Sequence, residues 1–392
     1  MSNTTGAGAA VDVARVRNAA AERLDDDLDL LAQLVAIDSG RDRPAGIEAV
    51  ELVIADRLAR LGAVAVWDDG AVPHVLLRLA AGERRVVIVT HADTVFAAGT
   101  AAARPYERDG DIVRGPGVVD MKGGLVLAVC ALEVLATIGA THTSVDLLIV
   151  GDEEVRTTPP PFMDVLGTAD AALVLECGRP GGGFVTSRKA GLWASVVATG
   201  RAAHSGTSKS AGSNAVDALA AEVVRIAELD RDRPDVSVST SMFSGGTAVN
   251  SVPARAEAWF DVRAPGSFDL AWVLAAMRDF DRHAGIALEL VPTEQWPAMT
   301  PTGDAWALAK LYESLAVDLG VEARQVATGG MSDGSWLSAA GVPTIDGLGP
   351  IGDADHSPEE WMQVSSFPVR SAMLAGLLVE LEWPGPWHQI LE

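Results

Sequence analysis

Apolar residues follow two different spacings along this chain, one typical of helices and one typical of buried strands. Residues 11–35 and 47–61 repeat apolar side chains at helical spacing, which predicts helices in both ranges. Short apolar runs come next (AVAVW, HVLLRL and RVVIVTH), then a helix at 125–138 and strand-like runs at DLLIV and ALVLE. Strands that alternate with helices are typical of a largely parallel sheet covered on both faces. The first part of the chain is therefore predicted to be an α/β domain.

The pattern changes at the glycines of residues 181–183 and returns to its first form near Met299. Between these points the expected order is strand, helix, strand, strand, helix, strand: LWASVVATG, 213–229, VSVSTSMF, ARAEAWFDV, 267–282 and IALELV. That order is the split βαββαβ arrangement of ferredoxin-like layers. Later elements are expected at 304–318, VPTID and about 366–380. We therefore expect a discontinuous α/β domain with a mixed, largely parallel sheet (1–188 and 298–392) and an inserted ferredoxin-like lid and dimerisation domain (189–297).

Charge and cysteine content exclude several classes of protein. The 392 residues include 53 acidic and 30 basic side chains, for a net charge of −23, which would repel nucleic acid. Cys130 and Cys177 stand in apolar surroundings, as free buried thiols of a reducing compartment do. The first residues lack the pattern of a secretory signal, and the longest apolar stretch, 125–140, is too short to span a bilayer. We expect a cytoplasmic protein without nucleic-acid or membrane partners.

Five potential metal ligands stand where predicted strands give way to loops: His91, Asp120, Glu154, Glu176 and His356. Any one of them alone reads as an ordinary solvated loop residue. Together they favour a cage for divalent metal, because two imidazoles and three carboxylates suffice for two ions if one carboxylate bridges. Nitrogen and oxygen donors without thiolate favour Zn²⁺, with Co²⁺ or Mn²⁺ as alternatives.

Two further carboxylates adjoin these ligands. Glu153 directly precedes Glu154, so one of the pair can bind metal while the other accepts a proton from water. The alternative for this pair is a solvated acidic turn. Asp93 lies two residues after His91 and faces the same side on an extended backbone, where it could orient the imidazole. Its alternative is a carboxylate that caps a loop.

Eight short motifs occur in one order along nearly the whole chain: HADTV, GPGVVDMKGG, GDEE, LVLE, GRAAHSG, VNSVPARAEAWFDVR, GGMSDGSW and GLGPIGDADHSPEEW. This ordered set resembles the dinuclear zinc aminoacylase/carboxypeptidase family, which includes bacterial glutamate carboxypeptidase, succinyl-diaminopimelate desuccinylase and acetylornithine deacetylase. The pattern is closest to the glutamate carboxypeptidase branch. The resemblance implies that His91 and Glu176 bind one zinc ion and that Glu154 and His356 bind the other. It also implies Asp120 as the bridge, Glu153 as general base and Asp93 as the orienting residue.

The resemblance assigns three more residues in the inserted domain. His204 corresponds to the family's oxyanion histidine, which often reaches the site of a partner subunit in a homodimer. Asn250 and Arg263 correspond to contacts with the substrate carboxylate, which a guanidinium binds with two hydrogen bonds. Taken singly, a histidine on a loop is usually structural, and Arg263 could be a surface arginine.

One segment departs from the family pattern. After GDEE many relatives carry a Gly/Ser-rich segment, whereas this chain has VRTTPPPFMD, in which Pro159, Pro160 and Pro161 stiffen the loop. We expect the adjoining pocket to differ from that of the branch, with the ligands unaffected.

The function expected from these residues is a dinuclear-metal amidohydrolase or metallopeptidase. Its substrate would be a small acyl-amino acid or peptide, cleaved at an amide bond next to a free carboxylate. The alternatives are an N-acyl-amino-acid deacylase, an N-carbamoyl hydrolase, and a non-catalytic metal-stabilised binding protein. Glu153 argues against the last, because a binding protein has no use for a base at that position.

Overall fold

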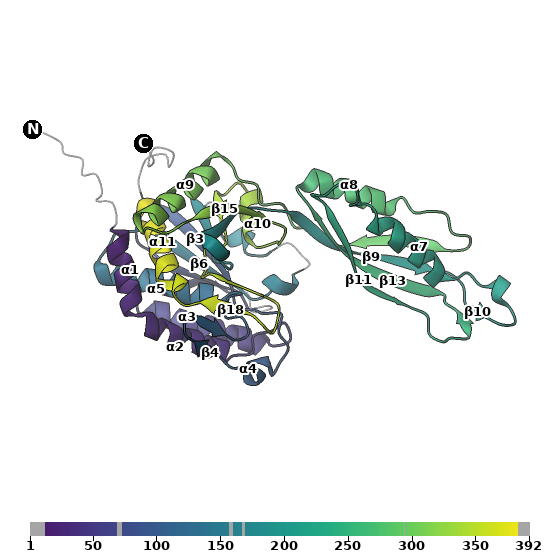
Figure 1. Cartoon of the computed structure of the whole chain (residues 1–392), viewed down its shortest axis with the longest axis horizontal. Coiled ribbons are helices and arrows are strands. Elements are labelled where there is room, and N and C mark those ends of the chain that lie inside the picture. The colour runs from purple at the N-terminus through teal and green to yellow at the C-terminus, as the bar shows by residue number, and fades with distance from the viewer. Residues whose placement is uncertain (1–11, 69–72, 157–159, 167–168, 294, 383–392) are drawn as a thin grey trace, which may run out of the picture.

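The chain forms two bodies that lie end to end (Figure 1). The computed structural model describes residues 12–68, 73–156, 160–166, 169–293 and 295–382. The larger body contains both ends of the described chain, and the smaller one is an elongated layer formed by β9 to β14, Ala190–Thr199 to Ala287–Pro292. The chain therefore crosses from the larger body to the smaller one once and returns once.

A six-stranded mixed sheet forms the centre of the larger body. Its strand order is β1-β2-β6-β3-β7-β16, and the strands from β6 to β16 are parallel, whereas β1 and β2 pair antiparallel. The sheet is thus mixed and largely parallel, as predicted. The strands are β1 (Val64–Asp68), β2 (Val75–Leu79), β3 (Arg85–His91), β6 (Ser144–Val150), β7 (Ala171–Val174) and β16 (Thr344–Ile345).

Both faces of this sheet are covered by other elements. This agrees with its central strands, which carry apolar side chains on both sides. On one face, α5 packs against β3 and is itself covered by the outer helices. On the other face, Phe162, Leu166 and Leu337 form a second cluster with strand residues such as Val89. The helices are α1 (Val13–Glu22), α2 (Leu24–Val35), α3 (Pro44–Ala59), α4 (Thr100–Ala103), α5 (Lys122–Ile138), α6 (Met163–Leu166), α9 (Gly303–Asp318), α10 (Gly334–Ala339) and α11 (Ser366–Glu380).

The first predicted helix, residues 11–35, is two helices in the structure. The break falls at Arg23, whose φ of −107° and ψ of 6° leave the helical region. Its guanidinium pairs with the buried Asp27 and the partly buried Glu133, so the break places a cation beside two carboxylates. Apolar spacing continues across the break, which is why the sequence reads as one helix.

The smaller body, which we call the inserted layer, is an antiparallel sheet with two helices. The strand order β11-β13-β9-β14 and the chain order are those of a ferredoxin-like layer. Leu192, Phe260 and Val262 belong to a hydrophobic cluster separate from that of the larger body. The elements are β9 (Ala190–Thr199), α7 (Ala215–Ala227), β11 (Ser237–Gly245), β13 (Arg255–Ala264), α8 (Ser267–Arg278) and β14 (Ala287–Pro292).

Several short elements were not predicted. A four-stranded antiparallel sheet has the order β17-β18-β5-β4, with strands at Gly352–Asp353, Trp361–Gln363, Ile112–Arg114 and Glu107–Asp109. A parallel pair joins β8 (Gly183–Arg188) to β15 (Arg324–Thr328), and β10 (Ala203–His204) pairs with β12 (Ser251–Val252). Short 3-10 turns lie at η1 (Glu153–Val155), η2 (Pro180–Gly182) and η3 (Lys209–Ala211). Strands of two to six residues are too short to show a period in the sequence.

The two passages between the bodies run side by side as a hydrogen-bonded ribbon. Arg188 and Met299 exchange backbone hydrogen bonds of 3.0 and 3.1 Å, and Gly191 and Trp296 exchange bonds of 3.1 and 2.8 Å. The Arg188 side chain is buried and donates to Asp346 Oδ2 at 2.6 Å, which anchors the ribbon to the larger body. The inserted layer is therefore held by two adjacent strands.

The prediction that Cys130 and Cys177 are buried, free thiols is confirmed. Burial raises the pKa of each thiol, so neither is a reactive thiolate at neutral pH. Among the helices in the described ranges, none has the length and apolar character that a membrane crossing requires.

Candidate metal centre and active site

The strands of the central sheet bring three of the five predicted ligands to one edge. His91 is the last residue of β3, Glu154 lies in the turn that follows β6, and Glu176 comes two residues after β7. Because β6, β3 and β7 are parallel neighbours, their carboxyl ends meet at the same edge of the sheet. Asp120 comes from the loop before α5, and His356 comes from the loop between β17 and β18.

The five side chains form two groups of three that share Asp120. His91 Nε2 lies 3.1 Å from Asp120 Oδ1 and 3.7 Å from Glu176 Oε1. On the other side, His356 Nε2 lies 3.1 Å from Asp120 Oδ2 and 3.0 Å from Glu154 Oε2. Within each group the possible ligand atoms lie within 4.8 Å of one another. Asp120 thus offers one oxygen to each group, as a bridging carboxylate does, and the donor set fits two divalent cations.

Crowded carboxylates give this cluster unusual proton affinities. Burial, together with the neighbouring Asp120 charge, raises the pKa of Glu176 to about 8. Hydrogen bonds from the His356 ring to Asp120 and Glu154 raise the pKa of His356 to about 11. Burial opposes ionisation of Asp120, but hydrogen bonds from His356 and His91 still hold its pKa well below the usual value. Without metal, the imidazoles therefore carry protons that offset the carboxylates.

Asp93 lies between His91 and the turn that carries Glu153 and Glu154. Its carboxylate accepts the backbone N–H of Glu153 at 3.2 Å and that of Glu154 at 3.0 Å. Its backbone oxygen lies 3.0 Å from His91 Nδ1, and its carboxylate oxygen lies 3.4 Å from the same nitrogen. One residue thus positions an imidazole through its main chain and a pair of glutamates through its side chain.

Glu153 faces the cavity that opens beside the cluster. The cavity has a volume of about 200 Å³ and lies where the inserted layer meets the larger body. Burial, and next the Glu176 charge, raises the pKa of Glu153 well above the usual value. All the ligands except His91 line the cavity together with Glu153, and its other lining residues are Cys177, Arg179, Arg188, Trp193, Arg263, Trp296, Gly330, Met331 and Asp355.

Arg263 on β13 reaches this cavity from the inserted layer. Its Nε and Nη2 atoms donate to the Asp261 carboxylate, each at 2.7 Å. Its Nη1 atom is buried and has no hydrogen-bond partner among the described residues. A buried donor without a partner is costly, so this atom is suited to an anionic group of a bound molecule.

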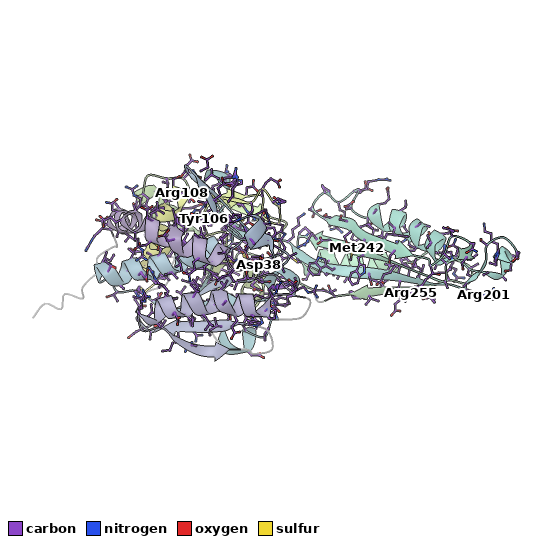
Figure 2. All side chains as sticks on the ribbon, turned by 90° about the horizontal axis from the view of Figure 1, so that it is seen from below. Asp38, Tyr106, Arg108, Arg201, Met242 and Arg255 are labelled. Carbon is purple, nitrogen blue, oxygen red and sulfur yellow. The ribbon has the colours of Figure 1, made fainter. Side chains whose placement is uncertain are left out.

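His204 and Asn250 are not brought to the cluster of the same chain. His204 ends β10, which lies at the end of the inserted layer farthest from the larger body (Figure 1). Asn250 is its neighbour, because its backbone oxygen accepts the N–H of Ser205 at 3.1 Å. Both residues are exposed, and neither is among the described residues that line the cavity. Figure 2 shows the same end of the layer from below, with Arg201 at its tip.

Comparison with known proteins identifies the family of this chain. The family model described as Peptidase family M20/M25/M40 matches residues 87–380, which is well over half of the chain. The chain belongs to this peptidase family. It is therefore a metal-dependent hydrolase of the M20 peptidase type.

Curated relatives of the M20 chain include peptidases and deacylases. It is 27% identical over 374 residues to carboxypeptidase G2 from Pseudomonas sp. (strain RS-16), covering 90% of this chain and 88% of that enzyme. It is 26% identical over 367 residues to succinyl-diaminopimelate desuccinylase from Bordetella pertussis, covering 86% and 93%.

Solved structures show the same fold at lower identity. A tripeptidase from Staphylococcus aureus superposes with a TM-score of 0.78 at 22% identity, over 92% of this chain and 98% of that chain. An M20 family metallo-carboxypeptidase from Sulfolobus solfataricus has a TM-score of 0.74 at 16% identity, over 90% and 98%. The fold of the M20 family, with its second, inserted layer, is therefore shared along nearly the whole chain.

Sequence reasoning missed Glu360, which holds the loop that carries Asp120. Its buried carboxylate accepts backbone N–H groups from Gly117 and Val119 at 2.9 Å each and from Asp120 at 3.1 Å. Glu360 and His356 belong to one short segment, so that segment supplies a ligand and supports the bridging carboxylate. The only signal in the sequence was the second glutamate of HSPEEW, which looks like a surface residue beside Glu359.

The proline-rich segment after Glu154 is described only in part. Pro159 lies outside the described residues, whereas Pro160 is buried and Pro161 is exposed. Phe162, which follows directly, is fully buried between the sheet and Arg156. The described part of the segment therefore packs onto the larger body beside the turn of Glu153.

Proposed function

We propose that this M20 protein is a dinuclear-metal amidohydrolase that cleaves an amide or peptide bond next to a free carboxylate, as a glutamate carboxypeptidase does. The observation that supports this most is one cavity lined by Glu153, by four of the five ligands of the two groups, and by Arg263, whose buried Nη1 atom has no hydrogen-bond partner among the described residues. The name carboxypeptidase G2 of one relative agrees with a substrate that carries a terminal carboxylate.

The proposed ligands are His91 and Glu176 for one ion and Glu154 and His356 for the other, with Asp120 shared. Their nitrogen and oxygen donors suit Zn²⁺ best among common divalent metals, and Co²⁺ or Mn²⁺ also match. Bound there, such ions would supply Lewis acidity for the scissile carbonyl and lower the pKa of water.

Glu153 is proposed as the general base. Its carboxylate would take a proton from the attacking water and return it to the leaving nitrogen. Its raised pKa suits both transfers, because a base works best when its pKa lies near the working pH. Asp93 would keep Glu153 in place through the backbone hydrogen bond of 3.2 Å.

Substrate binding is proposed to use Arg263 and, from a second subunit, Asn250. The Nη1 atom of Arg263 would donate to the substrate carboxylate in the cavity, which Trp193 and Trp296 also line. Asn250 stands beside His204 at the distant end of the inserted layer, so its contact would require another chain.

A homodimer formed through the inserted layer would bring His204 into a site. In this proposal, residues 189–297 act as lid and dimerisation domain for residues 1–188 and 298–392. The edge strand β11 supports it, because Met242 and Phe243 on that strand are 59% and 44% exposed. Exposed apolar residues on an open sheet edge favour pairing with another strand. His204 would then stabilise the negative charge that develops on the substrate oxygen in the partner's site.

A deacylase that removes an acyl group from an amino acid is the second candidate. The observation in its favour is the relative named succinyl-diaminopimelate desuccinylase, which covers 86% of the chain. Both candidates use the same site residues. An N-carbamoyl hydrolase would use them too, so only the measured substrate preference distinguishes the three activities. Two free cysteines and the negative charge favour a cytoplasmic enzyme without a nucleic-acid partner.

The test is hydrolysis by the metal-loaded protein across dipeptides, N-acyl-amino acids and N-carbamoyl-amino acids, each with a free and an amidated carboxylate. We expect activity only with the free carboxylate. Glu153→Ala should lower kcat by about 10²- to 10⁴-fold with about two metals retained per chain. Glu359→Gln, a charge-matched change at an exposed residue, should leave kcat unchanged. A Glu153→Ala enzyme within a few-fold of the parent would refute the assigned base.

Mixing two inactive variants tests the shared site. His204→Ala should lower kcat by about 10²- to 10³-fold with metal content unchanged. Combined with Glu153→Ala under conditions of subunit exchange, it should regain activity, because half of the hybrid sites hold both residues. Exchange without recovery would exclude His204 from the partner's site.

A further inference from the structure

Arg156 is a buried arginine that joins two carboxylates beside the cavity. It is 2% exposed, and its Nε and Nη2 atoms donate to Asp152 Oδ1 at 2.9 and 2.6 Å. On its other side, Nη1 and Nη2 both donate to the Asp333 carboxylate, the second bond at 3.3 Å. All three guanidinium nitrogens are thus used, which a lysine could not reproduce because it lacks a planar fork.

Asp152 and Arg156 enclose the short 3-10 turn η1 that carries Glu153. The 2.6 Å hydrogen bond between their side chains closes the turn on one side. Asp93 holds the backbone of the same turn from the other side. Three residues lie between Asp152 and Arg156, so a shift of the guanidinium moves the turn that carries Glu153.

The face of the same guanidinium contacts the passage to the inserted layer. Arg156 Cζ lies 5.3 Å from the Phe162 ring and 5.8 Å from the Trp296 ring. Trp296 is 4% exposed, lines the cavity and exchanges two backbone hydrogen bonds with Gly191 at the start of the layer. Its ring also packs on Trp336, with centroids 5.8 Å apart, in the helix that follows Asp333.

We propose that Arg156 is a positioning residue for Glu153 and that it links the placement of this base to the Trp296 passage of the inserted layer. Fixed between Asp152 and Asp333, the guanidinium keeps η1 in the conformation that directs Glu153 into the cavity. Its contact with Trp296 makes that conformation depend on how the inserted layer is packed. The inference rests on the proposed role of Glu153 as base.

Loss of the guanidinium should lower kcat rather than substrate affinity. Arg156 is not one of the described residues that line the cavity, so it is not expected to contact substrate. It also supplies no ligand to either metal group. Arg156→Lys keeps the charge but not the fork or the stacked plane. We expect kcat to fall by about 10- to 100-fold, KM to change less than threefold, and about two metals to stay bound, as for residues that orient a ligand or base.

Arg57→Lys is the matched control. Arg57 also donates two hydrogen bonds to one partly buried carboxylate, that of Glu133, at 2.7 and 2.9 Å. It lies on α3, and no described residue of that helix lines the cavity. A similar loss of thermal stability in both variants, with kcat lowered only in Arg156→Lys, would separate positioning from general destabilisation.

Repeating the Arg156→Lys change in the Glu153→Ala variant tests whether Arg156 acts through Glu153. In Glu153→Ala, the further change Arg156→Lys should lower the residual kcat by less than twofold, because no base is left to position. A full 10- to 100-fold loss in that background would overturn the proposal. The proposal would also be overturned if Arg156→Lys had the same kcat as the parent enzyme while Glu153→Ala was inactive. An active Glu153→Ala would instead overturn the proposed function, and this inference with it.

Trp296→Leu tests the link to the passage. It should lower kcat in the parent but add less than twofold to the loss in Arg156→Lys, because both changes release the same turn. Independent, multiplicative losses would show that Trp296 does not act through Arg156. If Arg156→Lys does not fold, the paired change Arg156→Met with Asp333→Leu, which leaves no charge of that pair buried alone, carries the same expectations.

Discussion

Loading the metal-free protein with divalent metal at pH 7 is expected to release about three protons per chain from the ligand side chains. The reason lies in the proton affinities of the metal-free cluster. His356 has a pKa of about 11, the pKa of His91 is raised well above its usual value, and Glu176 has a pKa of about 8. All three side chains are therefore largely protonated at pH 7. A metal ligand must give up its proton, so each contributes about one.

The number of released protons should fall as the pH rises through 8. At pH 9 Glu176 has already lost most of its proton in the metal-free state, whereas His356 still holds its own. The release should then be about two rather than three. Glu176→Gln should release about one proton fewer at pH 7 and show little change between pH 7 and 9.

Isothermal titration calorimetry in buffers with different ionisation enthalpies gives the proton count directly. The slope of the observed enthalpy against buffer enthalpy is the number of protons released, and the stoichiometry is read from the same titration. A release of less than one proton at pH 7 would refute the reasoning. An equal release at pH 7 and pH 9 in the parent would refute the assignment of the titrating group to Glu176.

Three further predictions concern stability and metal affinity. Glu176 and His356 bind protons more tightly in the folded chain, with pKa values of about 8 and 11, than in the unfolded chain, where the values are 4.5 and 6.5. The Tm of the metal-free protein should therefore fall steadily between pH 5 and 9, whereas the Tm of the metal-loaded protein should vary much less. Glu360→Ala should weaken metal binding by about 10- to 100-fold in competition with a chelating dye, and Glu360→Gln by less, because its amide oxygen still accepts hydrogen bonds. Gly124→Ala should lower the Tm and cost about 1–3 kcal/mol, because a Cβ there would lie 2.4 Å from the Leu175 backbone oxygen, whereas Gly303→Ala, with open space around it, should be nearly neutral.

The main architecture could be predicted because its elements are long and regularly spaced. The strands that end at His91 and near Glu176 are continuous apolar runs, so the sequence shows both the strand and the polar residue that follows it. Parallel strands then require those residues to meet at one edge of the sheet. The order of the four main strands and two helices in the inserted layer was also readable, because five of these six elements span nine residues or more.

Contacts between distant short segments could not be predicted. His356 reaches Asp120 because β18 pairs with β5, and these strands have only three residues each. Glu360 binds backbone atoms about 240 positions away, and no periodicity in the sequence reports such a contact. The pairing of Arg156 with Asp333 has the same character, since a buried arginine and a surface arginine look alike in sequence.

The ribbon that joins the two bodies separates the proposed metal ligands and base from the cavity-lining residues of the inserted layer. All five proposed metal ligands and Glu153 lie outside residues 190–292, whereas Trp193 and Arg263, which line the cavity, lie inside that stretch. Arg188 and Met299, at its two ends, are hydrogen-bonded neighbours, so the stretch enters and leaves the larger body at one point. A corresponding stretch from another family member could be joined at these two residues without rethreading the central sheet. Evolution could exchange this stretch in the same way, as one segment, while the proposed metal ligands and Glu153 stay unchanged.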